Sequence, residues 1–290
     1  MNKIGFVILN YKTYHDTLEL ILNLTEQVWF QDIKIYVVEN GSKNESIVEL
    51  EKAKDKYDFE LIISNQNLGF ANGNNLGILK AKSDGCEFVI CSNSGINVTK
   101  QDDFLQRIES IFDKDPKIAI IAPSIKNLDA IYQNPFRSQR FSTKEIIKMK
   151  FFYLSYFYKI YYFFRVYIFY ELITKLAQKR KNIQIATPSI KKKSSFIYAP
   201  HGSFLVFTPM FFKHYKGFDK NTLLYCEEFI LAEMLLKQDL LCWFENSIEV
   251  LHKESRTTDA IVKNYKEKVK FTLQQTFRSC RYFVKEIPKG

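Results

Sequence analysis

Residues 5–11 read Gly-Phe-Val-Ile-Leu-Asn-Tyr, a short apolar run that ends in two polar side chains. Similar β-branched runs follow at 33–38, 59–64, 88–92 and 118–122. Between the runs, apolar residues recur at helical spacing over 14–27, 46–57, 72–81 and 104–112. Short strands that alternate with helices are typical of βα units around a largely parallel sheet. The sequence therefore predicts an α/β fold with a nucleotide-binding first half.

The composition excludes several classes of protein. With 290 residues, 46% of them hydrophobic, the chain is long enough for one or two domains with a sizeable core. Ten glycines and seven prolines exclude a collagen-like or linker-like chain, and five cysteines without a CxxC pair exclude a zinc ribbon. The first apolar run is too short for a signal peptide and lacks a cleavage site, so we expect a cytoplasmic chain with reduced thiols.

The pattern changes after residue 127. A Lys-rich stretch leads into an aromatic block at 151–173, and β-type residues return at 196–208, followed by a helical pattern at 227–237. We expect one core domain with an embellishment. Its parts are an N-terminal α/β half at 1–134, a helical insertion at 135–195, a second part of the core at 196–256 and a basic amphipathic helix at 257–290.

Polar clusters follow four of the predicted strands. They are Asn10-Tyr11, Glu39-Asn40-Gly41-Ser42, Asn67-Leu68-Gly69-Phe70-Ala71 and Ser92-Asn93-Ser94-Gly95. In open α/β sheets, ligands bind outside the carboxyl ends of the strands. The shared location of the clusters predicts one binding site.

With these motifs the sequence resembles the family 2 glycosyltransferases, in particular bacterial surface-polysaccharide glycosyl- and rhamnosyltransferases. The resemblance continues through Gly202-Ser203-Phe204, Gly217-Phe218-Asp219, Tyr225-Cys226-Glu227-Glu228 and Val250-Leu251-His252. It covers about 1–130 and 196–256 and leaves out the block at 135–195. It implies the GT-A fold, which is a Rossmann-like sheet flanked by helices, and a nucleotide-diphosphate sugar as donor. It also implies that 1–134 is the nucleotide-sugar-binding half and 196–256 the acceptor-side half.

Tyr11 and Glu39 are the predicted recognition pair for the base. A uracil or thymine needs a flat partner and an acceptor for its ring N–H, and an ionised carboxylate is such an acceptor. The family usually has Asp at the position of Glu39. In the alternative interpretation, Glu39 caps the next turn and Tyr11 packs on the sheet edge. The other residues expected on the donor side are Asn10, Asn40, Asn67, Gly69, Asn75, Asn93, Ser94 and Gly95.

Gly95 is the main departure from the family, which places an aspartate for Mg²⁺ or Mn²⁺ at this strand end. Divalent ions of this kind prefer carboxylate oxygens, and neither Asn93 nor Ser94 supplies a charge. Three readings stay open: other groups hold the metal, Lys or Arg neutralises the diphosphate, or the site is impaired. Asp102 and Asp103 are expected to begin the next helix.

The resemblance assigns the acceptor side. Glu228 aligns with the general base of an inverting transfer, and Glu227 is its substitute; an acidic first turn of a helix is the structural alternative. His201, Gly202 and Asp219 are expected near the acceptor. His252 and Arg256 are candidates for the diphosphate or a metal, and Lys253 is a further phosphate partner.

The aromatic block and the net charge of +10 predict an anionic partner surface. Lys159, Arg165 and Glu171 share no single helix face, so we expect a hairpin or an in-plane element at a membrane surface rather than a spanning helix. Burial against the core or in a homodimer is the alternative. No nucleic-acid reading motif is present, so nucleic acid is not expected as a partner.

Together these features predict an inverting glycosyltransferase that uses a UDP- or dTDP-sugar and a lipid-linked or growing surface glycan, at the inner face of the plasma membrane. The alternative is a catalytically impaired binding or scaffold protein, because Gly95 replaces the expected aspartate.

Overall fold

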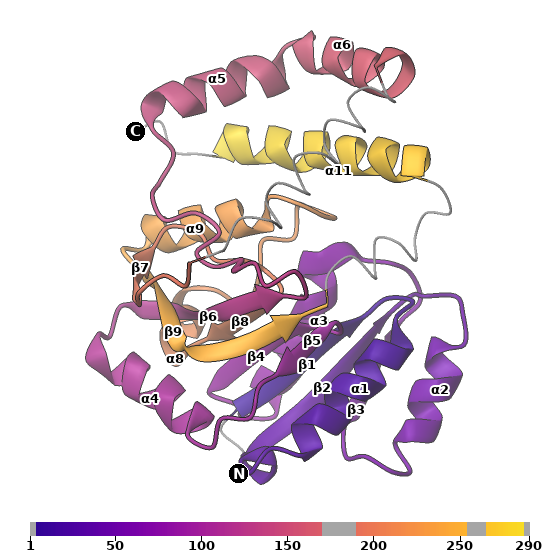
Figure 1. Ribbon diagram of the computed structural model, residues 1–290, viewed down its shortest axis with the longest axis vertical. Helices are drawn as coiled ribbons and strands as arrows, with labels where there is room; N and C mark the ends of the chain where they lie inside the picture. The colour runs from indigo at the N-terminus through magenta and orange to yellow at the C-terminus, as the bar shows by residue number, and fades with distance from the viewer. Residues whose placement is uncertain (1–3, 170–189, 254–264, 287–290) are drawn as a thin grey trace.

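The computed structural model describes residues 4–169, 190–253 and 265–286. Within these residues one nine-stranded sheet runs through the molecule, with helices on both faces (Figure 1). The strands are β1 (Ile4–Asn10), β2 (Ile33–Asn40), β3 (Glu60–Ser64), β4 (Phe88–Asn93), β5 (Ile96–Val98), β6 (Ile118–Asn127), β7 (Ser195–Ile197), β8 (Phe204–Phe207) and β9 (Leu241–His252). Their spatial order is β3-β2-β1-β4-β8-β6-β9-β5, with β7 beside β9.

The sheet combines a parallel half with a mixed half. Strands β3, β2, β1 and β4 pair in parallel, as predicted for the βα units. Strand β8 is antiparallel to β4 and β6, and β5 and β7 are antiparallel to β9. Shortly after the predicted strand at 88–92, residues 96–98 form a further strand, β5, which the sequence pattern did not predict. The β-type pattern at 196–208 also divides, into β7 and β8.

The helices form the layers around the sheet. They are α1 (Tyr14–Thr25), α2 (Ser46–Ala53), α3 (Gly69–Ser83), α4 (Phe104–Lys114), α8 (Pro209–His214) and α9 (Glu227–Lys237). The predicted start of α3 at residue 72 is three residues late. Strand side chains alternate: Phe6 and Ile8 pack with α1, α2 and α4, whereas Val7 packs with α3, α8 and α9.

A further helical layer lies beyond α9. It consists of α5 (Thr143–Leu154), α6 (Phe157–Phe163), the short turn η2 (Phe164–Ile168) and the C-terminal α11 (Tyr265–Glu286). Helix α11 lies between α5 and α9 (Figure 1). Ser142 and Glu145 form a capping box that starts α5. Among the described residues, none of the helices has the length and hydrophobicity needed to cross a bilayer.

Candidate active site

The carboxyl ends of β1, β2 and β4 meet at one edge of the sheet. Asn10 lies opposite Glu39, and Leu9 lies opposite Asn93. Strand β1 stands between β2 and β4, so the winding of the sheet reverses beside it, and such switch points form ligand crevices. The structure therefore brings the predicted polar clusters together.

Short polar side chains contact one another at this edge of the sheet. Thr13 Oγ1 and Ser94 Oγ lie 2.8 Å apart, which joins the loop after β1 to the loop after β4. Asn10 is fully buried, and its Oδ1 accepts a hydrogen bond from Thr17 Oγ1 (3.0 Å). Among the described residues its Nδ2 has no partner. An unsatisfied buried donor is costly, so a ligand oxygen here would complete the hydrogen bonding.

Glu39 caps a turn. The carboxyl group is completely buried, and its Oε1 accepts a hydrogen bond from the Ser42 N–H (2.7 Å). This is the structural role that the sequence left open beside base recognition. Tyr11 is half-buried next to it, with the Lys12 ammonium 5.5 Å from the ring centroid.

Asn40, Asn67 and Gly69 form a hydrogen-bonded corner at the start of α3. Asn40 Nδ2 donates to the Gly69 carbonyl (3.0 Å), and its Oδ1 accepts from the Leu68 N–H (3.0 Å). Asn67 Oδ1 accepts from the Gly69 N–H (2.8 Å). Both polar atoms of the Asn40 amide are hydrogen-bonded to backbone groups. Asn40 therefore positions the corner and does not present both polar atoms to a nucleotide.

Both polar atoms of the Asn75 amide are also hydrogen-bonded to backbone groups. Its Nδ2 donates to the Phe218 carbonyl (2.9 Å), and its Oδ1 accepts from the Phe218 N–H (2.8 Å). A Cβ on Gly217 would lie 2.3 Å from Asn75 Oδ1, so only glycine allows this approach. Asn75, predicted as a nucleotide contact, thus ties α3 to the loop formed by residues 217–226.

The C-terminal helix holds the other side of this loop. Tyr282 Oη donates to Asp219 Oδ2 (2.8 Å), and Ser279 Oγ donates to the Leu224 carbonyl (2.7 Å). Tyr225 Oη and Thr272 Oγ1 lie 3.2 Å apart. Sequence reasoning missed these α11 residues; the amphipathic pattern of the tail was the signal for a packed helix but named no partner. Asp219, expected near the acceptor, is bound by α11.

The loop ends in strained backbone directly before the two glutamates. Tyr225 and Cys226 have φ angles of +72° and +66°, in the left-handed region that side chains rarely adopt. Strain of this kind persists only where the surroundings hold it. It turns the chain sharply into α9, whose first residues are Glu227 and Glu228.

Glu227 and Glu228 lie in different surroundings. Burial raises the pKa of Glu227 to about 8, with the negative charge of Glu228 acting in the same direction. Its Oε1 has no hydrogen-bond partner within the described parts of the chain. Burial also raises the pKa of Glu228, although backbone hydrogen bonds from Glu228 itself and from Gly202 oppose this. A Cβ on Gly202 would lie 3.0 Å from Glu228 Oε1, so Gly202 gives this carboxylate room.

Two histidines pack together next to the glutamates. The rings of His201 and His252 have centroids 5.7 Å apart, edge to face. His201 Nδ1 lies 2.9 Å from Ser203 Oγ, and His252 Nδ1 lies 2.9 Å from Gln133 Oε1. Burial, with a contribution from His252, lowers the pKa of His201 to about 3, so His201 is neutral at physiological pH.

Comparison with known families identifies the family of the chain. The family described as "Glycosyl transferase family 2" matches residues 6–173, more than half of the chain. The chain belongs to glycosyl transferase family 2. No curated protein matches it by sequence.

Solved structures share the GT-A fold of this glycosyltransferase. S. aureus TarS matches at 12% identity and a TM-score of 0.52, over 87% of this chain and 60% of that one. GalNAc-T7, in a structure with UDP, GalNAc and Mn²⁺, matches at 11% and 0.57, over 88% and 44%. PcManGT, a mannosyltransferase from Pyrobaculum calidifontis with GDP-Man and Mn²⁺, matches at 9% and 0.55, over 97% and 68%. The chain spans less than two-thirds of the TarS and GalNAc-T7 structures.

The side chains at the end of β4 are the ones expected to hold a divalent metal ion in this family. Asn93, Ser94 and Gly95 offer no carboxylate there, and Asp103 pairs with Arg107 at the start of α4 (2.7 Å). In the described part of the chain, no three His, Cys, Asp or Glu side chains are grouped to hold a metal ion. These residues do not fit a hard divalent cation. Arg256, the other predicted diphosphate or metal candidate, lies outside the described residues.

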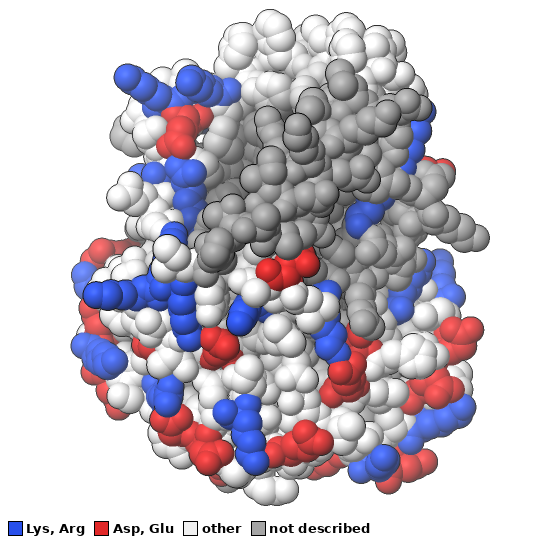
Figure 2. All heavy atoms as spheres, in the orientation of Figure 1, with Lys and Arg blue, Asp and Glu red and all other residues white. Residues whose placement is uncertain are grey.

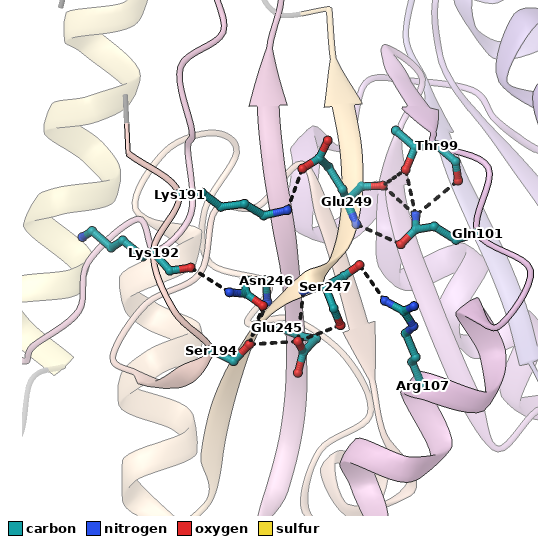
Figure 3. A network of polar contacts seen from close by, with 10 residues as sticks. All are labelled: Thr99, Gln101, Arg107, Lys191, Lys192, Ser194, Glu245, Asn246, Ser247 and Glu249. Atoms are coloured by element: carbon teal, nitrogen blue, oxygen red, sulfur yellow. Dashed lines mark hydrogen bonds and ion pairs between the residues drawn. The ribbon is translucent and has the colours of Figure 1, made fainter. Parts of the chain in front are cut away.

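A polar network fixes the strand that leads to His252 (Figure 3). Strand β9 bulges between Glu245 and Glu249, which pair with the consecutive β6 residues Pro123 and Ser124. Glu245 Oε1 accepts hydrogen bonds from Ser247 and Ser194, and Arg107 donates to the Ser247 carbonyl (2.9 Å). Although burial raises the pKa of Glu245, these hydrogen bonds and one from Trp243 hold it below its usual value. These contacts therefore hold the bulge of β9 in place.

Proposed function

We propose that this family 2 glycosyltransferase moves a sugar from a UDP- or dTDP-linked donor to a hydroxyl group of a lipid-linked or growing surface glycan, with inversion at the anomeric carbon. The observation that carries the proposal is the placement of Glu227 and Glu228. They begin α9 directly after a loop that Asn75 ties to the nucleotide edge of the sheet.

The reaction is one in-line displacement. The Glu228 carboxylate takes the proton of the acceptor hydroxyl as its oxygen forms a bond to the anomeric carbon. The bond from that carbon to the diphosphate oxygen breaks at the same time, and the nucleoside diphosphate leaves with the electron pair. Glu228 then returns the proton to solvent.

The unequal environments of the two glutamates divide their roles. With a pKa of about 8, Glu227 is mostly protonated at pH 7. A protonated carboxyl group cannot accept the proton of the acceptor hydroxyl. Glu228 is therefore the base, and Gly202 leaves space beside its carboxylate.

The base pocket is assigned to Tyr11, Glu39 and the free amide N–H of Asn10. Glu39 uses Oε1 for the turn cap, so its remaining lone pairs serve a pyrimidine N–H. Complexes of similar structures support a nucleotide-sugar partner: TarS binds UDP and UDP-GlcNAc, and PcManGT binds GDP-Man. Calorimetric titration with UDP, dTDP, GDP and CMP tests the pocket, and selective binding of GDP or CMP would refute it.

Replacement of the base gives the test of mechanism. Glu228→Gln keeps the size of the side chain but cannot accept the proton, so we expect release of nucleoside diphosphate from UDP- or dTDP-sugars to fall by about 10² to 10⁴. UDP affinity by calorimetry should stay within about threefold. Glu109→Gln, an exposed substitution on α4, is the control. Normal turnover of Glu228→Gln would remove Glu228 from the base role.

The second candidate function is a catalytically impaired binding protein. Gly95 favours it because the family's acidic residue is missing at this position. If Gly95→Asp creates activity that the parent chain lacks, the parent is impaired. If the parent releases nucleoside diphosphate in the presence of acceptor lipid, the impaired candidate falls.

The exposed side of α5, α6 and η2 is assigned to a membrane surface. Figure 2 shows an uncharged area at the top of this end of the molecule, bordered on one side by charged side chains. We call the large apolar side chains exposed on these elements the aromatic patch. Its members are 41–76% exposed: Ile147, Phe151, Leu154, Tyr156, Phe157, Ile160, Tyr161, Phe163, Phe164, Tyr167, Ile168 and Phe169. Patches of this size mark interaction sites, and Tyr and Phe suit the headgroup boundary.

Charge favours lipid over a second copy of the chain. Residues 143–169 carry Lys144, Lys148, Lys150 and Lys159, whereas Glu145 is bound to Arg137 (2.7 Å). A twofold homodimer would set these lysines against each other, but an anionic leaflet would neutralise them. The charges therefore support the proposed position at the inner face of the plasma membrane, where a lipid-linked acceptor would be presented.

Vesicle flotation tests the surface. The triple variant Phe151→Ser, Tyr156→Ser, Phe157→Ser should lose binding to vesicles of phosphatidylcholine with phosphatidylglycerol, while Leu128→Ser, equally exposed elsewhere, should bind like the parent. Absence of parent binding together with concentration-dependent dimers that the triple variant abolishes would instead assign the patch to a second copy.

A further inference from the structure

Lys253 stands beside Gly95 at the end of β4. Strand β5 pairs with β9 so that Ile96 lies opposite His252, and the Lys253 N–H donates to the Gly95 carbonyl (2.8 Å). A Cβ on Gly95 would find Lys253 Cβ as its nearest neighbour, at 3.9 Å. The position where the family carries an acidic side chain is thus open space next to a lysine stem.

The charge at this position is inverted. Asn93, Ser94 and Gly95 are uncharged, and the backbone hydrogen bond to Gly95 brings the cationic residue Lys253 beside them. The side chain of Lys253 is only 16% exposed and forms an ion pair with Glu19, whose side chain is 52% exposed. An ion pair with so exposed a partner contributes little, so a diphosphate can displace Glu19 at small cost.

We propose that Lys253 neutralises the diphosphate of the sugar nucleotide in place of a divalent cation, so that nucleoside diphosphate binding does not depend on metal. The inference rests on the proposed function, because it concerns the same donor site. A lysine ammonium is a compact charge that binds phosphate oxygens well. The same ammonium repels a divalent cation from this position.

The role of Lys253 in the reaction is electrostatic. As the bond between the anomeric carbon and the diphosphate breaks, negative charge grows on the leaving oxygens, and a fixed ammonium at hydrogen-bond distance stabilises it. Lys253 keeps its proton throughout, so the proton balance between acceptor and Glu228 is unchanged. Glu19 holds the ammonium near the strand end before the donor arrives.

The test is calorimetric titration of UDP and dTDP into the full chain, once with EDTA and once with Mn²⁺. We expect affinities with EDTA and Mn²⁺ to agree within about threefold. Lys253→Met, which keeps the stem and removes the charge, should weaken binding in EDTA by tenfold or more, as loss of a charged hydrogen bond does. Lys117→Met removes a more exposed ion pair, with Asp239, at the opposite end of the strands and should bind like the parent.

Gly95→Asp gives an independent measurement, since the space beside Gly95 admits a side chain. It should pair with Lys253, weaken UDP binding in EDTA and make that binding respond to Mn²⁺. Parent binding that falls tenfold in EDTA, or a Lys253→Met variant that binds like the parent, would overturn the inference and leave the proposed function intact. Failure to bind either nucleotide under both conditions would overturn the proposed function as well.

Discussion

Asn75 binds both backbone polar groups of Phe218, across 143 residues of chain. The contact joins α3, whose first residues form a corner at the nucleotide edge, to the loop 217–226 that leads into Glu227 and Glu228. Phe70 and Leu223 add a second link, since the Phe70 N–H donates to the Leu223 carbonyl (2.8 Å). These contacts hold the start of α3 and the loop before the two glutamates together.

Asn75→Ala should destabilise the fold by about 2 to 3 kcal/mol, because it removes two hydrogen bonds and leaves the Phe218 N–H without its acceptor. Urea unfolding at pH 7 measures the change. Asn72→Ala is the control: it removes an exposed bond to the Lys220 carbonyl (3.0 Å) and a long one to the Leu68 carbonyl (3.5 Å), and should cost less than about 1 kcal/mol. Equal losses in the two variants would contradict the special role of Asn75.

Gly69→Ala should also destabilise strongly. The φ angle of Gly69 is +82°, and its Cβ would lie 2.3 Å from the Leu223 carbonyl oxygen. Backbone strain and the required shift of Leu223 predict a loss of roughly 2 kcal/mol or more. Gly95→Ala, where the nearest atom is 3.9 Å away, should change the free energy of unfolding by less than about 0.5 kcal/mol. The urea unfolding midpoints of the two variants, each compared with that of the parent chain, measure these changes.

Glu227→Gln should change the pH dependence of stability. An unfolded glutamate titrates near pH 4.3, about 4 pH units below the folded value of about 8. Between these values the folded chain binds a proton that the unfolded chain has released, so the free energy of unfolding falls as pH rises. Glutamine removes this slope and should stabilise the protein at pH 8 by on the order of 4 kcal/mol.

The measurement is urea unfolding at pH 5 and pH 8. Glu109→Gln, on an exposed face of α4, should keep the slope of the parent. A Glu227→Gln variant with the parent's slope would mean that Glu227 is ionised in the folded protein.

Release of the loop from α11 should lower turnover more than donor binding. The triple variant Tyr282→Phe, Ser279→Ala, Thr272→Val removes the polar contacts to the loop and keeps the packing shape. Because the strained Tyr225 and Cys226 lose support, we expect kcat to fall by tenfold or more, with KM for the donor within about twofold. Gln274→Ala, which removes an α11 contact to Tyr162 instead, should leave kcat unchanged. Parallel changes in kcat and KM would indicate a general structural defect.

Local patterns predicted the elements well. The helix expected at 227–237 is α9 to the residue, and the first strand and its helix differ from β1 and α1 by only one or two residues. The parallel half of the sheet was predictable because each βα unit follows its neighbour along the chain. The polar strand ends met as expected, since parallel strands end at a common edge.

Side-chain roles were harder to predict. Asn40 and Asn75 have residue types that suit a nucleotide, yet their amides bind backbone groups of Leu68 and Phe218. A hydrogen-bonding side chain carries no mark in the sequence that separates a ligand partner from a protein partner. Glu39 illustrates the same ambiguity, because its carboxylate caps a turn and still has lone pairs to offer.

The sequence by itself determined the α/β class, the order of the elements and the acidic start of α9, because hydrophobic periodicity and turn chemistry act between near neighbours. Only the tertiary structure decided that β8 enters the sheet antiparallel between β4 and β6, that α11 holds the loop before Glu227, and that Lys253 stands beside Gly95. Each of these contacts joins residues more than 45 positions apart, where partner choice depends on how the whole chain buries its surface and satisfies its polar groups.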